Sequence, residues 1–202
     1  MTRAEPANPM PKDAREKMMI ERRSFIKNTA LMITVQLAGQ RMLLSPAEAA
    51  SRDLPLNFLT SVEAAALEHL AESMVPGAAK AGVVHFVDSQ LAGDPNDSLL
   101  IARYFGIVPP HGDFYRSGLT ALDRAARASR RTGFPELSIQ EAMQMARALL
   151  TGEIAAWHGP PSALFYQCVR SDAVDVVYGT PAGFEALGIP YMQHIMPPKS
   201  WS

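Results

Sequence analysis

A pair of arginines near the start of the chain constrains how the rest of it must fold. Residues 21–27 read Glu-Arg-Arg-Ser-Phe-Ile-Lys, and a weakly apolar run covers residues 29–44. This order and spacing are typical of a twin-arginine (Tat) export signal, which moves chains that have already folded. The alternative is a disordered basic tail that contains two arginines by chance. We assign the export signal to four residues of the motif: Arg22, Arg23, Phe25 and Lys27.

The apolar run does not have the character of a permanent membrane anchor. A spanning helix needs about 20 mostly uninterrupted apolar residues. This run is interrupted by polar side chains at Thr34, Gln36, Gln40 and Arg41. Small residues at Ala47 and Ala49 occupy the two positions that a signal peptidase checks. We therefore predict a Tat signal peptide over residues 1–49, cleaved after Ala49, and one periplasmic domain over residues 50–202 without a membrane span after processing.

The chain without its leader is acidic and has one cysteine. The sequence has 19 Lys and Arg residues, of which eight lie within residues 1–49, and 20 Asp and Glu residues, of which five lie there. Residues 50–202 therefore have a net charge of about −4. This charge argues against nucleic acid or an anionic membrane surface as a partner. With Cys168 alone, a disulfide within the chain, a multi-thiolate metal site and covalent c-type haem are excluded. Cys168 is either buried or bonded to another chain, and both alternatives stay open.

Helical periodicity with Pro and Gly punctuation predicts an all-α fold. Capping boxes at Thr60–Glu63 and Ser138–Glu141 begin two helices. Apolar residues at intervals of three and four extend these helices to about residues 74 and 157. They place Val62 of the first helix and Leu150 of the second on the core-facing side. The same spacing predicts further helices over about 79–91, 113–131 and 162–170, and the only strand-like stretch is 175–178. In the second of these helices, four residues are expected to face inward: Tyr115, Leu119, Leu122 and Ala126. Residues 178–202 combine Pro and Gly with apolar side chains, which predicts an irregular extended tail packed against its own domain or a partner. The expected fold is a small multi-helix domain with this irregular C-terminal segment.

The titratable residues form no recognisable catalytic, cofactor or metal motif. His85 and Asp88 are three apart on an expected helix, which favours a structural pair over an acid–base dyad. Asp172 and Asp175 are three apart after an expected helix end, which favours capping and turn formation over calcium binding or glycoside hydrolysis. Glycine-rich nucleotide loops are missing as well. We predict no catalytic, cofactor-binding or metal-binding residue in this chain, although Tat export is typical of cofactor-containing proteins.

Several segments of the sequence are similar to one known family. They are the twin-arginine leader and residues 59–76, 76–88, 171–180, 187–191 and 194–198. On these segments, the chain resembles the gluconate 2-dehydrogenase subunit 3 family over most of residues 57–201. Members of this family are the small subunits of membrane-associated dehydrogenases.

The resemblance implies a non-catalytic subunit of a three-part complex. An FAD-containing catalytic subunit would oxidise a sugar or sugar acid, and a cytochrome c subunit would pass the electrons onward. The small subunit would carry no cofactor and would take the flavin subunit through the Tat translocase. The apolar tail and the single cysteine supply the residues expected to bind the partner: Cys168, Tyr178, Tyr191, His194 and Trp201.

Two alternatives belong to other functional classes. One is a stand-alone periplasmic helical protein that binds a small ligand or metal through His85, His158 and nearby acids. The other is an enzyme whose active site has no recognisable motif. Neighbouring genes for a flavoprotein without a signal and for a cytochrome c would favour the subunit hypothesis over both.

Overall fold

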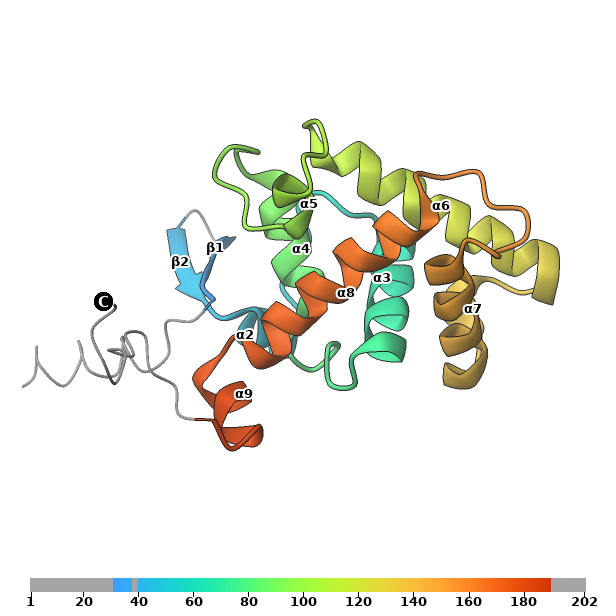
Figure 1. Ribbon diagram of the computed structural model, residues 1–202. Coiled ribbons are helices and arrows are strands. Elements are labelled where there is room, and N and C mark those ends of the chain that lie inside the picture. Colours follow the sequence, from blue (N-terminus) through green and yellow to red (C-terminus); the bar gives the residue numbers. More distant parts are fainter. Residues whose placement is uncertain (1–30, 38–39, 190–202) are drawn as a thin grey trace, which may run out of the picture.

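The computed structural model describes residues 31–37 and 40–189, and their fold is mostly helical (Figure 1). This confirms the all-α prediction, with one small hairpin added. The described elements are β1 (Ile33–Leu37), β2 (Gln40–Leu44), α2 (Pro46–Ser51), α3 (Ser61–Met74), α4 (Val83–Ala92), α5 (Ile101–Tyr104), α6 (His111–Arg130), the 3-10 helix η1 (Phe134–Glu136), α7 (Ile139–Thr151), α8 (Ser162–Tyr178) and α9 (Pro181–Ala186).

Helix α3 lies at the centre of the domain and packs against α4, α6, α7 and α8. It begins as predicted, because the Thr60 hydroxyl accepts the Glu63 N–H at 3.3 Å and the Thr60 N–H donates to the Glu63 carboxylate at 2.8 Å. Its buried face contains Leu67 and Leu70, whereas Val62, expected in the core, is exposed. The capping box therefore sets where the helix begins, and its neighbours decide which face is buried.

Helices α6 and α7 show where periodicity succeeds and where it fails. All four residues predicted to face inward from α6 are buried: Tyr115, Leu119, Leu122 and Ala126. Helix α7 begins at the predicted capping box but ends at Thr151, so its predicted extension to Trp157 is wrong. Gly152 adopts φ +76° at its C-cap, a left-handed conformation that ends helices. Leu150, placed in the core by the pattern, is exposed, and Leu149 is buried instead.

Helix α8 corrects the reading of residues 170–178. It runs over 17 residues to Tyr178, so the predicted end near residue 170 is wrong, and the strand-like stretch 175–178 is its last turn. Asp172 and Asp175 therefore lie inside a helix instead of after one. The sequence has no glycine or proline between Ser162 and Tyr178, so the helix continues until Gly179, its C-cap.

Residues from the expected leader form part of the described domain. Strands β1 and β2 make an antiparallel hairpin in which Ile33 pairs with Leu44. Ile33, Val35 and Leu44 point into the hydrophobic core, while Thr34 is exposed, as the period of a strand requires. Helix α2 follows and packs on α4. Residues on both sides of the boundary expected at Ala49 thus share one core, and cleavage at that boundary stays a prediction.

Candidate functional site

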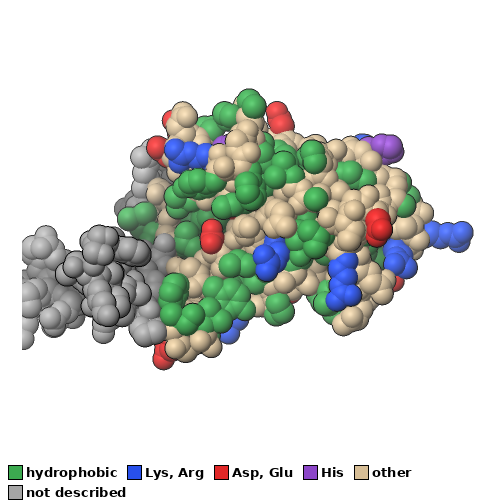
Figure 2. Space-filling model, in the orientation of Figure 1, with side chains coloured by type: hydrophobic (Ala, Val, Ile, Leu, Met, Phe, Trp, Pro, Cys, Tyr) green, Lys and Arg blue, Asp and Glu red, His purple; other side chains and the backbone are tan. Residues whose placement is uncertain are grey.

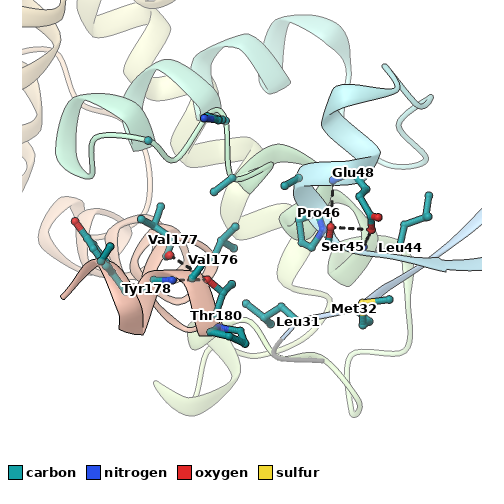
Figure 3. A pocket seen from close by; sticks show the side chains of 18 of the residues that line it. Leu31, Met32, Leu44, Ser45, Pro46, Glu48, Val176, Val177, Tyr178 and Thr180 are labelled. Atoms are coloured by element: carbon teal, nitrogen blue, oxygen red, sulfur yellow. Dashed lines mark hydrogen bonds between the residues drawn. The ribbon is translucent and has the colours of Figure 1, made fainter. Parts of the chain in front are cut away.

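An apolar groove of about 890 Å³ lies between two walls. The hairpin and α2 form one wall, and the end of α8 together with α9 forms the other. Figure 3 shows Leu44 and Pro46 on one side and Val176, Val177 and Tyr178 on the other. The lining residues are Leu31, Met32, Leu43, Leu44, Ser45, Pro46, Ala47, Glu48, Gly77, Lys80, Ala81, Val176, Val177, Tyr178, Thr180, Pro181, Ala182, Gly183 and Ala186.

Local hydrogen bonds hold both walls in place. On one wall, the Ser45 hydroxyl accepts the Glu48 N–H at 3.2 Å, and the Ser45 N–H donates to the Glu48 carboxylate at 2.9 Å. These bonds to Ser45, the backbone one first, lower the pKa of the Glu48 carboxyl. On the other wall, the Thr180 hydroxyl accepts the Gly183 N–H at 3.0 Å and fixes the turn from α8 into α9. The groove therefore lies between two capped helix starts.

The chemistry of the groove suits an apolar segment. Its lining has one carboxylate, Glu48, and one ammonium group, Lys80, and most of the other side chains are aliphatic. Leu43 on the lining is exposed, and so are Leu187 and Ile189, which follow α9. Such apolar side chains contribute free energy of association when a partner buries them, and they carry no reactive group.

A second apolar surface covers α5 and the loop after it. Tyr104 is 66% exposed and Val108 is 81% exposed, with Leu99 and Phe105 beside them in the sequence. Figure 2 shows hydrophobic side chains gathered over α5 and over α9 on the same face of the molecule. Clustered exposed apolar side chains, aromatic ones among them, are typical of protein–protein contact surfaces.

The structure places two of the predicted partner-binding residues. Tyr178 lines the groove at the end of α8. Cys168 is a free thiol, fully buried in α8, and burial raises its pKa to about 12. The other predicted site residues lie outside the described residues: Arg22, Arg23, Phe25 and Lys27 of the export signal, and Tyr191, His194 and Trp201 of the tail.

His85 and Asp88 both have structural contacts, but they do not form the expected pair. The buried Asp88 carboxylate accepts the N–H groups of Asn57, Phe58 and Leu59 at 2.8, 2.9 and 2.8 Å. The Nε2 atom of His85 lies 3.0 Å from the Leu54 carbonyl oxygen. Both side chains therefore hold the segment that leads into α3.

Asp172 is a buried hydrogen-bond acceptor inside α8, so the prediction that it caps or turns the chain after its own helix is wrong. Its carboxylate accepts the Ile101 N–H at 3.0 Å and the Tyr115 hydroxyl proton, which joins α5 and α6 to α8. Burial raises the pKa of Asp172 to about 7, while these two hydrogen bonds act in the opposite direction. Desolvation also raises the pKa of Asp175, although its side chain is exposed.

The residues proposed for a metal site lie in different parts of the fold. His85 is in α4, and His158 is exposed in the loop between α7 and α8. Within residues 31–37 and 40–189, no three His, Cys, Asp or Glu side chains come together in a way that could hold a metal ion. None of the helices described there has the length and apolar character needed to cross a membrane.

A family model described as gluconate 2-dehydrogenase subunit 3 matches residues 61–195, about two thirds of the chain. The chain belongs to the gluconate 2-dehydrogenase subunit 3 family. The match begins at the first residue of α3 and includes α8 and α9, so one wall of the groove lies within it. The hairpin and α2 precede the match. No curated protein and no solved structure matches this chain.

The wall formed by α2 could have been found from sequence. Ser45-Pro46-Ala47-Glu48 is a capping box with proline at the first helical position. The same residues overlap the small-residue pattern of a signal peptidase site, and that pattern determined the sequence interpretation. The capping box at Ser45 was therefore the sequence signal that predicts the start of α2.

Proposed function

We propose that this chain is the non-catalytic small subunit and Tat export escort of an FAD-dependent sugar or sugar-acid dehydrogenase. The observation that carries this proposal is the family match over residues 61–195, because the family's description is that of one subunit of a dehydrogenase. FAD in the catalytic partner accepts electrons from the substrate, and a cytochrome c subunit receives them. The subunit works in the periplasm and associates with the membrane through the complex.

The groove is our candidate docking surface for the FAD-containing subunit. Its aliphatic lining and the exposed Leu187 and Ile189 offer apolar area that a partner can bury. Tyr178 contributes a ring with a polar end, a frequent interface anchor. The chain passes from α9 directly into the tail that contains Tyr191, His194 and Trp201, so we assign these residues to the same contact.

Export of the complex tests the escort role. The variant with Arg22→Lys and Arg23→Lys keeps the positive charge but removes the receptor-read pair, so the chain and its flavin partner should both stay in the cytoplasm. A matched control replaces Arg3 and Arg15 with lysine in the same polar leader. Immunoblots of periplasmic fractions and dye-linked dehydrogenase activity report the outcome. Unchanged periplasmic activity in the Arg22/Arg23 variant would contradict the escort role.

A charge placed in the groove tests the docking surface. Ala186 is exposed and lines the groove, so Ala186→Arg should fold normally and weaken co-purification of the flavin subunit. Ala128→Arg, at an exposed position of α6 that does not line the groove, is the matched control. Val108→Arg tests the α5 surface in the same assay. Loss of binding in the Val108 variant alone would move the contact from the groove to α5.

The isolated chain also separates this proposal from a stand-alone ligand-binding protein. We expect the purified subunit to show no flavin or haem absorbance and no dehydrogenase activity. A groove of this volume is within the range of small-molecule sites. Native mass spectrometry that finds a stoichiometric small molecule on the lone chain would therefore favour the ligand-binding alternative.

A further inference from the structure

The peptide bond after Ala49 lies inside a helix and against the core. The Ala49 side chain is 0% exposed, although the sequence places it at the end of a removable leader. Its N–H donates to the Ser45 carbonyl at 3.0 Å, and its carbonyl accepts the Leu54 N–H at 3.2 Å. A protease needs its substrate drawn out into an extended conformation, which here would require α2 to unfold locally.

The first residues of α4 hold α2 from the opposite side. Gly82 is the N-cap of α4 with φ +81°, and a Cβ atom there would overlap the Pro46 carbonyl group. Because glycine has no Cβ, the start of α2 can lie directly on this backbone. Gly77 also has a positive φ, +94°, but a Cβ atom added at Gly77 would meet nothing within 4 Å, which makes this position a control.

The hairpin continues this attachment toward the N-terminus. Ile33 and Val35 of β1 and Leu44 of β2 are buried in the same core cluster as Ala49. Strand β1 also contacts α4. A cut after Ala49 would separate these four side chains from the domain and would remove the groove wall formed by Leu31, Met32 and residues 43–48.

We infer that the exported subunit keeps residues 31–51 as a structural wall of its docking groove. The contact of Pro46 with Gly82 keeps α2 folded, and the folded helix prevents signal peptidase from reaching the Ala49–Ala50 bond. Any processing of the leader takes place before Leu31. This inference rests on the proposed export function for its biological setting, but the protection of residues 31–51 can be measured without export.

Hydrogen exchange on the purified full-length chain is the first test. The amides of Ala49, Arg52 and Leu54 are hydrogen-bonded within and after α2. They should exchange on the order of a hundredfold slower than the same amides in a peptide of residues 42–56. Exchange at the rate of the free peptide would overturn the inference.

A pair of glycine variants tests what holds α2. Gly82→Ala should speed exchange across residues 46–54 at least about tenfold while α7 keeps its protection, because α2 must move away from α4. Gly77→Ala adds the same side chain at a positive φ without a contact, so exchange over 46–54 should stay unchanged. Equal behaviour of the two variants would refute the role of the Gly82 contact. If Gly82→Ala fails to fold, the wild-type measurement still decides the protection of α2.

The mass of the exported chain is the second test. Intact mass spectrometry of the subunit recovered with its complex should find a chain that contains residues 31–202. An N-terminus at Ala50 would overturn the inference. Absence of the chain from the periplasm contradicts the export proposal instead, and the exchange measurements then stand alone as the test.

Discussion

The Asp172→Asn variant tests whether one buried carboxylate lowers the stability of this domain near neutral pH. Asp172 is 1% exposed and joins three helices through Ile101 and Tyr115. Asparagine has nearly the same shape. Its carbonyl can accept the Ile101 N–H, and its amide can donate to the Tyr115 oxygen. The substitution therefore removes the charge and retains the packing.

The magnitude follows from the difference between the folded and unfolded pKa values. Burial raises the pKa of Asp172 from 3.8 to about 7, so the folded state binds a proton that the unfolded state has released between these values. This contribution to stability is fully present below pH 3.8 and is lost as the pH rises through 7. At about 1.4 kcal/mol per pH unit, the loss between pH 5 and pH 8 is on the order of 3 kcal/mol.

Urea unfolding at pH 5, 6, 7 and 8 measures this effect. We expect the free energy of unfolding of Asp172→Asn, relative to wild type, to rise by on the order of 3 kcal/mol from pH 5 to pH 8. Tyr115, Cys168 and Asp175 remain in the variant; burial is the main cause of the raised pKa of Tyr115 and Cys168, and the Asp172 charge adds to it. Asp97→Asn, at an exposed position, makes the same charge change and should show no such trend. Parallel pH profiles for wild type and Asp172→Asn would refute the reasoning.

Three further predictions concern other parts of the chain. Asp88→Ala leaves three backbone N–H groups without their acceptor and should lower the free energy of unfolding by about 3–5 kcal/mol, whereas Asp94→Ala at an exposed position should not. Cys168 should react with iodoacetamide only after unfolding, and non-reducing gels of the complex should show separate subunits; a band at the summed mass would establish the intersubunit disulfide instead. Tyr191→Ala and Trp201→Ala should each weaken association with the flavin subunit by about 1–3 kcal/mol without loss of helicity by circular dichroism, and unchanged binding would exclude the tail from the contact.

The starts of the two capped helices were predictable from sequence because their causes are local. The capping boxes at Thr60 and Ser138 use residues three apart, and both form as predicted. The end of α7 was missed because the apolar spacing continues past Gly152, whose left-handed conformation stops the helix. Periodicity reports which side chains could share a face, but a single glycine decides whether the backbone continues.

The contacts of the buried acids depend on long-range packing and could not be predicted. Asp172 meets Tyr115 and Ile101, which are 57 and 71 residues away in the sequence. Asp88 meets a segment about 30 residues before it. The spacing of three residues predicted a His85–Asp88 pair, and it predicted capping or turn formation by Asp172 and Asp175. The structure instead gives Asp88 and Asp172 long-range contacts.

The buried carboxylates stabilise the fold, whereas in our proposal the groove binds the partner. Asp88 accepts N–H groups just before α3, and Asp172 accepts the first N–H of α5. Backbone N–H groups in the segment before α3 and at the start of α5 have no acceptor within a helix, so a buried carboxylate there satisfies donors that would otherwise destabilise the fold. Both acids accept hydrogen bonds from groups inside the domain, and neither lines the groove, whose lining is mainly aliphatic. This arrangement fits a subunit whose described surface serves association, with the redox chemistry assigned to the flavin partner in our proposal.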